Sequence, residues 1–262
     1  MTFPSAAATE GNRGRCGQDG AVTTRLPSLH GQLITFASGP SETGGRDEDI
    51  DALAGVVSGH VDGLDVTVRL TRDGVAVLAD SDRIRTGLRR KRIDGFDAVD
   101  LPPEIPTLAN ILAQTSDRNP LFVTVGGDST FEAVLSTART HGPEVETRLW
   151  LVGHDQSELI RWRPRTQALM LLGTARRRVG GGLERLLAEV HGDDLDGVSM
   201  PHADWSGGSI ALAHRFGLRT HASGGRHNRE LASVIDAGID AITADDPIRL
   251  GAVAAEFYPN GG

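Results

Sequence analysis

Polar and apolar side chains alternate along one extended segment, residues 64–70. Asp65, Thr67 and Arg69 share one face of this segment, because successive side chains of a strand point to opposite sides, and the other face is apolar. Asp80 follows the next apolar run. Carboxylate and hydroxyl oxygens are the groups that bind a hard cation or a polar ligand, so this face is a candidate site.

Three histidines lie at or near the ends of later strand candidates: His154, His202 and His221. Histidine titrates near neutral pH and is the commonest general acid or base. Two of these side chains at one end of a barrel could form an acid/base pair. Each can equally be an ordinary polar residue whose hydrogen bonds are satisfied, and their spacing in the sequence does not decide between these interpretations.

Arginines gather in two segments, residues 83–92 and residues 176–178. A guanidinium group pairs with a phosphate through two parallel hydrogen bonds, so either segment could hold an anion. Arg83 and Arg85 could also donate hydrogen bonds to Asp80. The alternative for both segments is a solvated loop.

The positions of the strand candidates favour a parallel sheet with crossover helices. The candidates are residues 32–37, 64–70, 75–79, 121–125, 148–152, 168–172, 197–200, 218–222 and 240–243. Helical patterns follow most of them, at about residues 47–58, 107–114, 156–163, 183–190, 209–216 and 228–237, with Ser129 and Asp246 as caps of two further helices. The turn at residues 71–74 is too short for a crossover helix, so its two strands form a hairpin or one lies outside the sheet.

Composition limits the classes of function. The chain has 262 residues, a formal net charge of −8 and a single cysteine. The negative charge disfavours general nucleic-acid binding, and one cysteine excludes an internal disulfide. No apolar run reaches transmembrane length and no signal peptide is evident, so we expect a cytoplasmic protein without a membrane span. We expect residues 1–29 to form a disordered tail and residues 30–262 to form one domain.

Several segments resemble the glycerophosphodiester phosphodiesterase family. They are residues 61–80, the Ile-Pro-Thr-Leu segment at residues 105–108, and the block Ala-Gly-Ile-Asp-Ala-Ile-Thr-Ala-Asp-Asp-Pro at residues 237–247. The resemblance covers residues 31 to 252 and implies a distorted (β/α)8 TIM barrel of the phospholipase-C-like superfamily, with a role in lipid metabolism. An open doubly wound sheet is the alternative fold.

The resemblance also implies a chemistry that this sequence retains only in part. The family uses a divalent cation and a histidine pair, and the matching positions here hold Asp65 at a glutamate, Thr67 at an aspartate and Ala79 at a histidine. Residues 35–39 lack the histidine and arginine that follow the first family strand, and Thr124 stands where a ligand glutamate is expected.

Asp47 and Asp65 are the carboxylates that remain for a residual Mg²⁺ or Ca²⁺ site. The other candidate ligand-binding side chains are Asp80, Arg83, Arg85, Thr67, Thr124 and Ser223. We therefore expect a degenerate member of the family, a non-catalytic binding or regulatory protein for a phosphorylated or polyol small molecule. The alternatives are weak metal-dependent phosphodiester hydrolysis, new chemistry by the histidines in the same barrel, and a purely structural partner protein.

Overall fold

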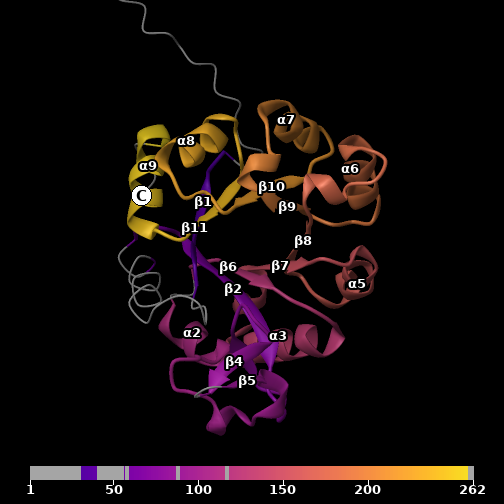
Figure 1. Ribbon diagram of the computed structural model, residues 1–262. Coiled ribbons are helices and arrows are strands. Elements are labelled where there is room, and N and C mark those ends of the chain that lie inside the picture. Colours follow the sequence, from indigo (N-terminus) through magenta and orange to yellow (C-terminus); the bar gives the residue numbers. More distant parts are fainter. Residues whose placement is uncertain (1–30, 40–55, 57–58, 87–88, 116–117, 259–262) are drawn as a thin grey trace, which may run out of the picture.

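The computed structural model describes residues 31–39, 56, 59–86, 89–115 and 118–258. Eight parallel strands close into a barrel, because β1 pairs with β2 on one side and with β11 on the other (Figure 1). Around the barrel they are β1 (Ile34–Ser38), β2 (Gly63–Leu70), β6 (Leu121–Thr124), β7 (Leu149–Gly153), β8 (Leu169–Gly173), β9 (Gly197–Pro201), β10 (Arg219–Ser223) and β11 (Ala241–Ala244). This single-domain (β/α)8 barrel confirms the predicted fold.

Helices pack on the outside of the barrel. They are α2 (Leu108–Gln114), α3 (Asp128–His141), α4 (Pro143–Thr147), α5 (Gln156–Trp162), α6 (Leu183–Gly192), α7 (Gly207–Arg215), α8 (Asn228–Asp236) and α9 (Pro247–Phe257). Asp246 caps α9 as predicted, since its carboxylate accepts the backbone N–H of Arg249 at 2.9 Å. The cap predicted at Ser129 is wrong: the N-cap of α3 is Gly127, two residues earlier. No helix in the described part of the chain is both long and apolar enough to cross a bilayer.

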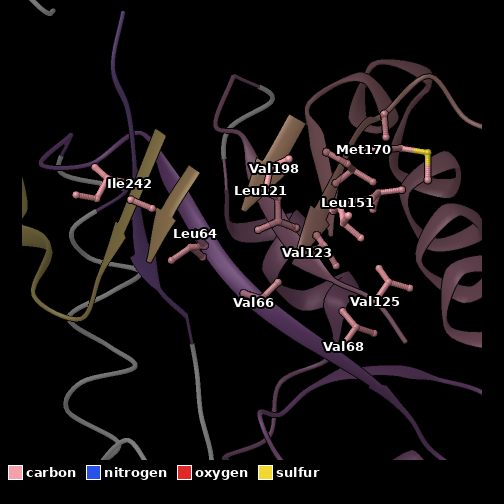
Figure 2. Packing of buried hydrophobic residues seen from close by; sticks show 14 of the residues in the cluster. Leu64, Val66, Val68, Leu121, Val123, Val125, Leu151, Met170, Val198 and Ile242 are labelled. Atoms are coloured by element: carbon pink, nitrogen blue, oxygen red, sulfur yellow. The ribbon is translucent and has the colours of Figure 1, made fainter. Parts of the chain in front are cut away.

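The main hydrophobic core lies between the barrel and its helices. Leu64, Val66 and Val68 follow one another along one side of β2 and belong to this cluster (Figure 2). The inward face of the barrel holds a second, smaller cluster that includes Phe36, Phe122 and Trp150. Alternation along each strand therefore separates a helix-facing apolar layer from an interior that is partly aromatic and partly polar.

The hairpin predicted at residues 71–74 is confirmed, with Gly74 at a φ of 80° in the turn. The short strand β3 (Ala76–Leu78) pairs antiparallel with the end of β2 and lies outside the barrel, so one of the nine strand candidates is excluded from it. All nine are present, with bounds shifted by at most two residues. The helix predicted over residues 47–58 falls almost entirely outside the described residues.

An insertion follows β3 and contains a second hairpin that the sequence did not predict. Strands β4 (Arg83–Thr86) and β5 (Arg89–Arg92) pair antiparallel, and the short 3-10 helices η1 (Ile93–Gly95) and η2 (Ala98–Asp100) follow. Ile84 and Ile93 are 2% and 1% exposed and pack with Val77 and Ala79 of the β3 segment. The charged segment therefore has a small core of its own on one side, although it was expected to be a polar loop.

Three aspartates fix the N-terminal end of the barrel. Each directly precedes a strand and accepts the backbone N–H of the second residue of a neighbouring strand: Asp62 from Thr35, Asp196 from Met170 and Asp240 from Thr220, at 2.7, 2.8 and 2.8 Å. These carboxylates satisfy donors at strand ends, where the ladder of a closed barrel begins. This end of the barrel is accordingly built for stability.

Candidate functional site

A chain of four hydrogen-bonded side chains crosses the barrel interior. Ser199 lies opposite His221 in the sheet register, and its Oγ is 2.8 Å from Nδ1 of the imidazole. Nε2 of His221 is 2.8 Å from Oγ1 of Thr243, and Thr243 donates to Oδ2 of Asp65 at 2.8 Å. Strands β9, β10, β11 and β2 each contribute one member, so closure of the barrel creates the chain.

His221 is a core residue and not a group at the barrel mouth. It is 0% exposed, and its ring lies 4.0 Å from that of Phe122 and 6.2 Å from that of Phe36 between centroids. Burial lowers the pKa of His221 to about 3, so the imidazole is neutral at physiological pH. His221, expected at or near a strand end, is the third of the five residues of β10, and both of its nitrogens are hydrogen-bonded inside the barrel.

Of the four hydrogen-bonded side chains, Asp65 is the nearest to the C-terminal end of the barrel. Burial raises its pKa to about 7, an effect that the hydrogen bond from Thr243 reduces and the negative charge of Asp80 increases. When Asp65 is ionised, Thr243 donates to it, and the hydroxyl oxygen of Thr243 then accepts from Nε2–H of His221. Nδ1 of His221 is left to accept the Ser199 hydroxyl, so all three donors point towards the carboxylate.

Three hydroxyl groups line the interior beyond Asp65. Thr67 and Thr124 are directly opposite one another on β2 and β6, and Ser223 ends β10. All three side chains are half-buried, and their hydroxyls have no hydrogen-bond partner among the described residues. Hydroxyls of this kind can each donate one hydrogen bond and accept others from a bound molecule.

His154 and His202 do lie at the C-terminal ends of strands, but the structure keeps them apart. Nδ1 of His154 is 2.8 Å from the carbonyl oxygen of Gly173, and Nδ1 of His202 is 3.3 Å from that of Ser223. They follow β7 and β9, with β8 between them, which is about 10 Å along the ring of strands. The two imidazoles therefore do not form a pair.

Arg69 joins the site although the sequence singled it out only as a member of the polar face. It lies two residues beyond Thr67 on β2, and its Nη2 donates to the carbonyl oxygen of Asp80 at 2.8 Å. Its Nε is buried without a hydrogen-bond partner in the described structure. The contacting residues Ser199 and Thr243 were not predicted either, and only their alternation within strands could have indicated that they face inward.

The other predicted residues lie further out or outside the described residues. Arg83 and Arg85 are exposed on β4 of the insertion, and Asp80 is exposed at its start. At the rim of the barrel, Ser38 donates to Oδ1 of Asp245 at 2.9 Å. Asp47 lies outside the described residues.

The described donor set does not fit a tight Mg²⁺ or Ca²⁺ site. Such ions require six or more oxygen ligands, of which proteins usually supply several carboxylates. No group of three or more histidine, cysteine, aspartate or glutamate side chains in the described ranges is arranged to hold a metal. Asp65 is half-buried, bound to Thr243 and inclined by its raised pKa to keep a proton.

A polar groove of about 550 Å³ lies at the opposite end of the barrel, lined by Arg139, Pro143, Glu146, Thr147, Pro164, Arg165, Thr166 and Gln167. The hydrogen bond from Arg139 is the main reason that the pKa of Glu146 falls to about 2. Glu146 also accepts from the Thr166 hydroxyl and the Gln167 backbone N–H, at 2.7 and 3.0 Å. Its carboxylate therefore joins the segments before β7 and β8, which is a structural task.

Comparison with solved structures identifies the same class of barrel. A candidate glycerophosphoryl diester phosphodiesterase from Silicibacter pomeroyi superposes with a TM-score of 0.73 at 14% identity, covering 90% of this chain and 96% of that one. A phosphodiesterase of Oleispira antarctica in complex with the product sn-glycerol-3-phosphate gives 0.70 at 14% identity, covering 86% and 98%.

A glycerophosphodiester phosphodiesterase of Thermotoga maritima gives a TM-score of 0.67 at 15% identity, covering 83% of this chain and 96% of that one. No protein-family model and no curated protein matches the sequence. The chain thus has the fold of these phosphodiesterases, while its sequence is far from theirs.

Proposed function

We propose that this barrel binds a small polyol or phosphorylated polyol at its C-terminal end and does not hydrolyse phosphodiesters. The observation that carries the proposal is the set of hydroxyls of Thr67, Thr124 and Ser223, which bind no other described residue, beyond the half-buried carboxyl of Asp65. Hydroxyls and a carboxyl that can keep its proton match the hydroxyl groups of a polyol in both donors and acceptors. Ligand sites of (β/α)8 barrels are built at this end.

The histidines argue against efficient hydrolysis. Cleaving a phosphodiester requires one group to take a proton from the nucleophile and another to give one to the leaving alcohol. His221 is enclosed in the core, and His154 and His202 follow strands that are not neighbours. The loss of one general acid or base typically costs about 10²–10⁴ in rate. A site whose described residues supply no histidine pair is therefore better suited to binding than to efficient catalysis.

Two observations favour a phosphorylated ligand among polyols. Arg69 has a guanidinium near the mouth whose hydrogen bonds are incompletely satisfied, and such a group binds phosphate oxygens well. The Oleispira antarctica phosphodiesterase of the same fold is in complex with sn-glycerol-3-phosphate. Glycerol 3-phosphate is therefore the first ligand to test, with a binding or regulatory role for this protein.

A second function is favoured by Asp65 alone. A carboxyl whose pKa is raised to about 7 is matched to proton transfer at neutral pH. In this alternative Asp65 takes a proton from a water molecule whose oxygen bonds to phosphorus, and returns it to the alcohol oxygen as its bond to phosphorus breaks. A glycerophosphodiester and water are thus slowly converted to glycerol 3-phosphate and an alcohol. New chemistry by His154 or His202 has less support. Nε2 of His202 is 3.9 Å from a carboxylate oxygen of Glu230, but neither imidazole contacts the hydrogen-bonded side chains from Ser199 to Asp65.

Calorimetric titration of the full chain with glycerol, glycerol 3-phosphate and glycerophosphocholine tests the first function. We expect heat with glycerol 3-phosphate, and affinity about tenfold weaker for the Thr67→Val/Thr124→Val double variant, since each lost hydrogen bond is worth about 1 kcal/mol or less net. Thr140→Val, which removes an exposed helix hydroxyl, is the matched control. Absence of heat at millimolar ligand contradicts the proposal.

Product release from glycerophosphocholine separates the two functions. Turnover that disappears in Asp65→Asn but persists in His154→Ala would establish the second one, and a chelator would show whether a metal takes part. Binding without turnover in the unmodified chain supports the first.

A further inference from the structure

The hairpin formed by β4 and β5, here called the basic hairpin, carries arginines directly opposite one another. Arg83 pairs in register with Arg92, and Arg85 pairs with Arg90. Because side chains alternate along each strand, these four guanidinium groups share one face, and all four residues are exposed. Ile84 lies on the other face, where it is buried in the insertion core.

This arrangement opposes the stability of the hairpin. Like charges directly opposite one another on antiparallel strands are destabilising, and a two-stranded ribbon is marginally stable without help. Contacts on the opposite face stabilise the hairpin. There Ile84 packs with Ile93, and Nζ of Lys91 lies 5.6 Å from the ring centroid of Phe96. The insertion therefore holds a set of mutually repelling arginines in place, and local choices that oppose the fold are expected at functional sites.

Ion pairs of Arg92 lie at the base of the basic hairpin. Arg92 forms ion pairs with Asp82 at 2.8 Å and Asp94 at 2.7 Å. Towards the turn, Arg90 is exposed and forms no ion pair with a carboxylate in the described part of the chain. Within residues 81–94 six basic residues face two acidic ones, in a chain whose formal net charge is −8.

We propose that the basic hairpin docks the protein on an anionic phospholipid bilayer. The basic hairpin lies at the edge of the molecule, away from α6 to α9 (Figure 1). A few basic residues at a bilayer surface each contribute about 1 kcal/mol. Nucleic acid requires a longer track of phosphate contacts, which an acidic chain with one patch does not offer.

The acidic remainder of the protein does not prevent such docking. Charges more than about 8 Å from the surface are largely screened at physiological salt, so the local patch dominates contact with a bilayer. This proposal stands on the insertion and is independent of ligand binding inside the barrel.

Co-sedimentation of the full chain with vesicles tests it. Vesicles of phosphatidylcholine with phosphatidylglycerol should bind the protein, and phosphatidylcholine alone should not. Arg85→Gln/Arg90→Gln should lower the partition coefficient about thirtyfold, as two lost basic contacts imply. The charge-matched control Arg215→Gln/Arg229→Gln removes two exposed arginines from α7 and α8, across the molecule, and should change it less than threefold.

Other results have defined meanings. Equal losses in both double variants, displacement from vesicles by millimolar inorganic phosphate, or tighter binding to a short DNA duplex than to vesicles would each overturn the proposal. Arg85→Lys/Arg90→Lys keeps the charge and should retain binding. If the glutamine variant fails to fold, this lysine variant and release of the unmodified protein by raised salt decide the matter, since both depend only on charge.

Discussion

Asp240 and Asp65 lie in neighbouring parts of the same barrel and have opposite electrostatics. Burial tends to raise the pKa of Asp240, but the hydrogen bond and charge of His214 and the donors of Thr220 outweigh it, so this pKa is lowered. Among the described residues Thr243 is the one hydrogen-bond donor to the Asp65 carboxyl, and burial raises the pKa of Asp65 to about 7. At the N-terminal end of the barrel, several hydrogen-bond donors surround the Asp240 carboxylate. In the C-terminal half, the Asp65 carboxyl has fewer donors and lies next to the hydroxyls of Thr67 and Thr124.

This contrast shows where the fold tolerates a carboxyl group with few hydrogen-bond donors. A carboxylate with several donors is fixed as an ion and stabilises the strands it joins. A carboxyl with few donors is costly to ionise. It can instead keep its proton, or accept a hydrogen bond from a ligand hydroxyl. The difference between the two ends can be measured.

Replacing Asp240 should have the largest effect on stability. Asp240→Ala leaves the Thr220 N–H and hydroxyl and the His214 imidazole without their acceptor, so we expect a loss of about 3–5 kcal/mol in the free energy of unfolding. Urea denaturation measures it. Asp245→Ala, at the exposed C-terminal end of the same strand, should cost less than about 1 kcal/mol. Similar losses in both variants would contradict the contrast between the ends.

Replacing His221 should have the next largest effect. His221→Leu keeps the volume but removes a hydrogen-bond partner from both Ser199 and Thr243 inside the barrel, which should cost about 2–3 kcal/mol. His154→Leu, at an exposed position, should stay within about 0.5 kcal/mol. Thermal unfolding of both variants compares them, and equal stability would contradict the structural role of the His221 hydrogen bonds.

The pH dependence of stability sharpens the comparison further. Between about pH 4 and 6.5 the folded chain keeps a proton on Asp65, and the unfolded chain carries one on His221 instead. The numbers of bound protons are equal, so these two groups give no net slope. In Asp65→Asn only the unfolded chain binds a proton, so stability should fall as the pH drops from 6.5 to 4.

We expect the free energy of unfolding of Asp65→Asn to decrease relative to the unmodified chain by about 2 kcal/mol over that range, after allowing for the solvent near this half-buried site. Urea denaturation at several pH values tests this difference, in which the other carboxylates cancel. Parallel pH profiles for the two proteins would show that Asp65 is ionised in the folded state.

The smallest effect on stability is expected at the mouth. Thr67→Val and Thr124→Val remove hydroxyls that bind no described residue, so the free energy of unfolding should change by less than about 0.5 kcal/mol. The same variants should weaken glycerol 3-phosphate binding in calorimetry. A large loss of stability instead would show that these hydroxyls are structural.

The sequence predicted the strands better than it predicted the depth of the site. Alternation in residues 64–70 correctly separated the face of Asp65 from the helix-facing side of β2. The same alternation shows that the His221 side chain points into the barrel. It does not give the position of His221 along the barrel axis, because that position depends on the stagger between β10 and its neighbours. Ile84 and Ile93 were missed as a core, since charged residues separate them in the chain.

The hydrogen bonds that link Ser199, His221, Thr243 and Asp65 can run in either direction, with donors and acceptors exchanged. Should Asp65 gain a proton and donate it to Thr243, the hydroxyl of Thr243 turns to Nε2 of His221, and the imidazole hydrogen moves to Nδ1 facing Ser199. Every heavy atom can stay where it is. A change of pH would then alter only the positions of hydrogen atoms in the barrel interior. Nitrogen chemical shifts or neutron diffraction would detect this change, and an electron-density map would not.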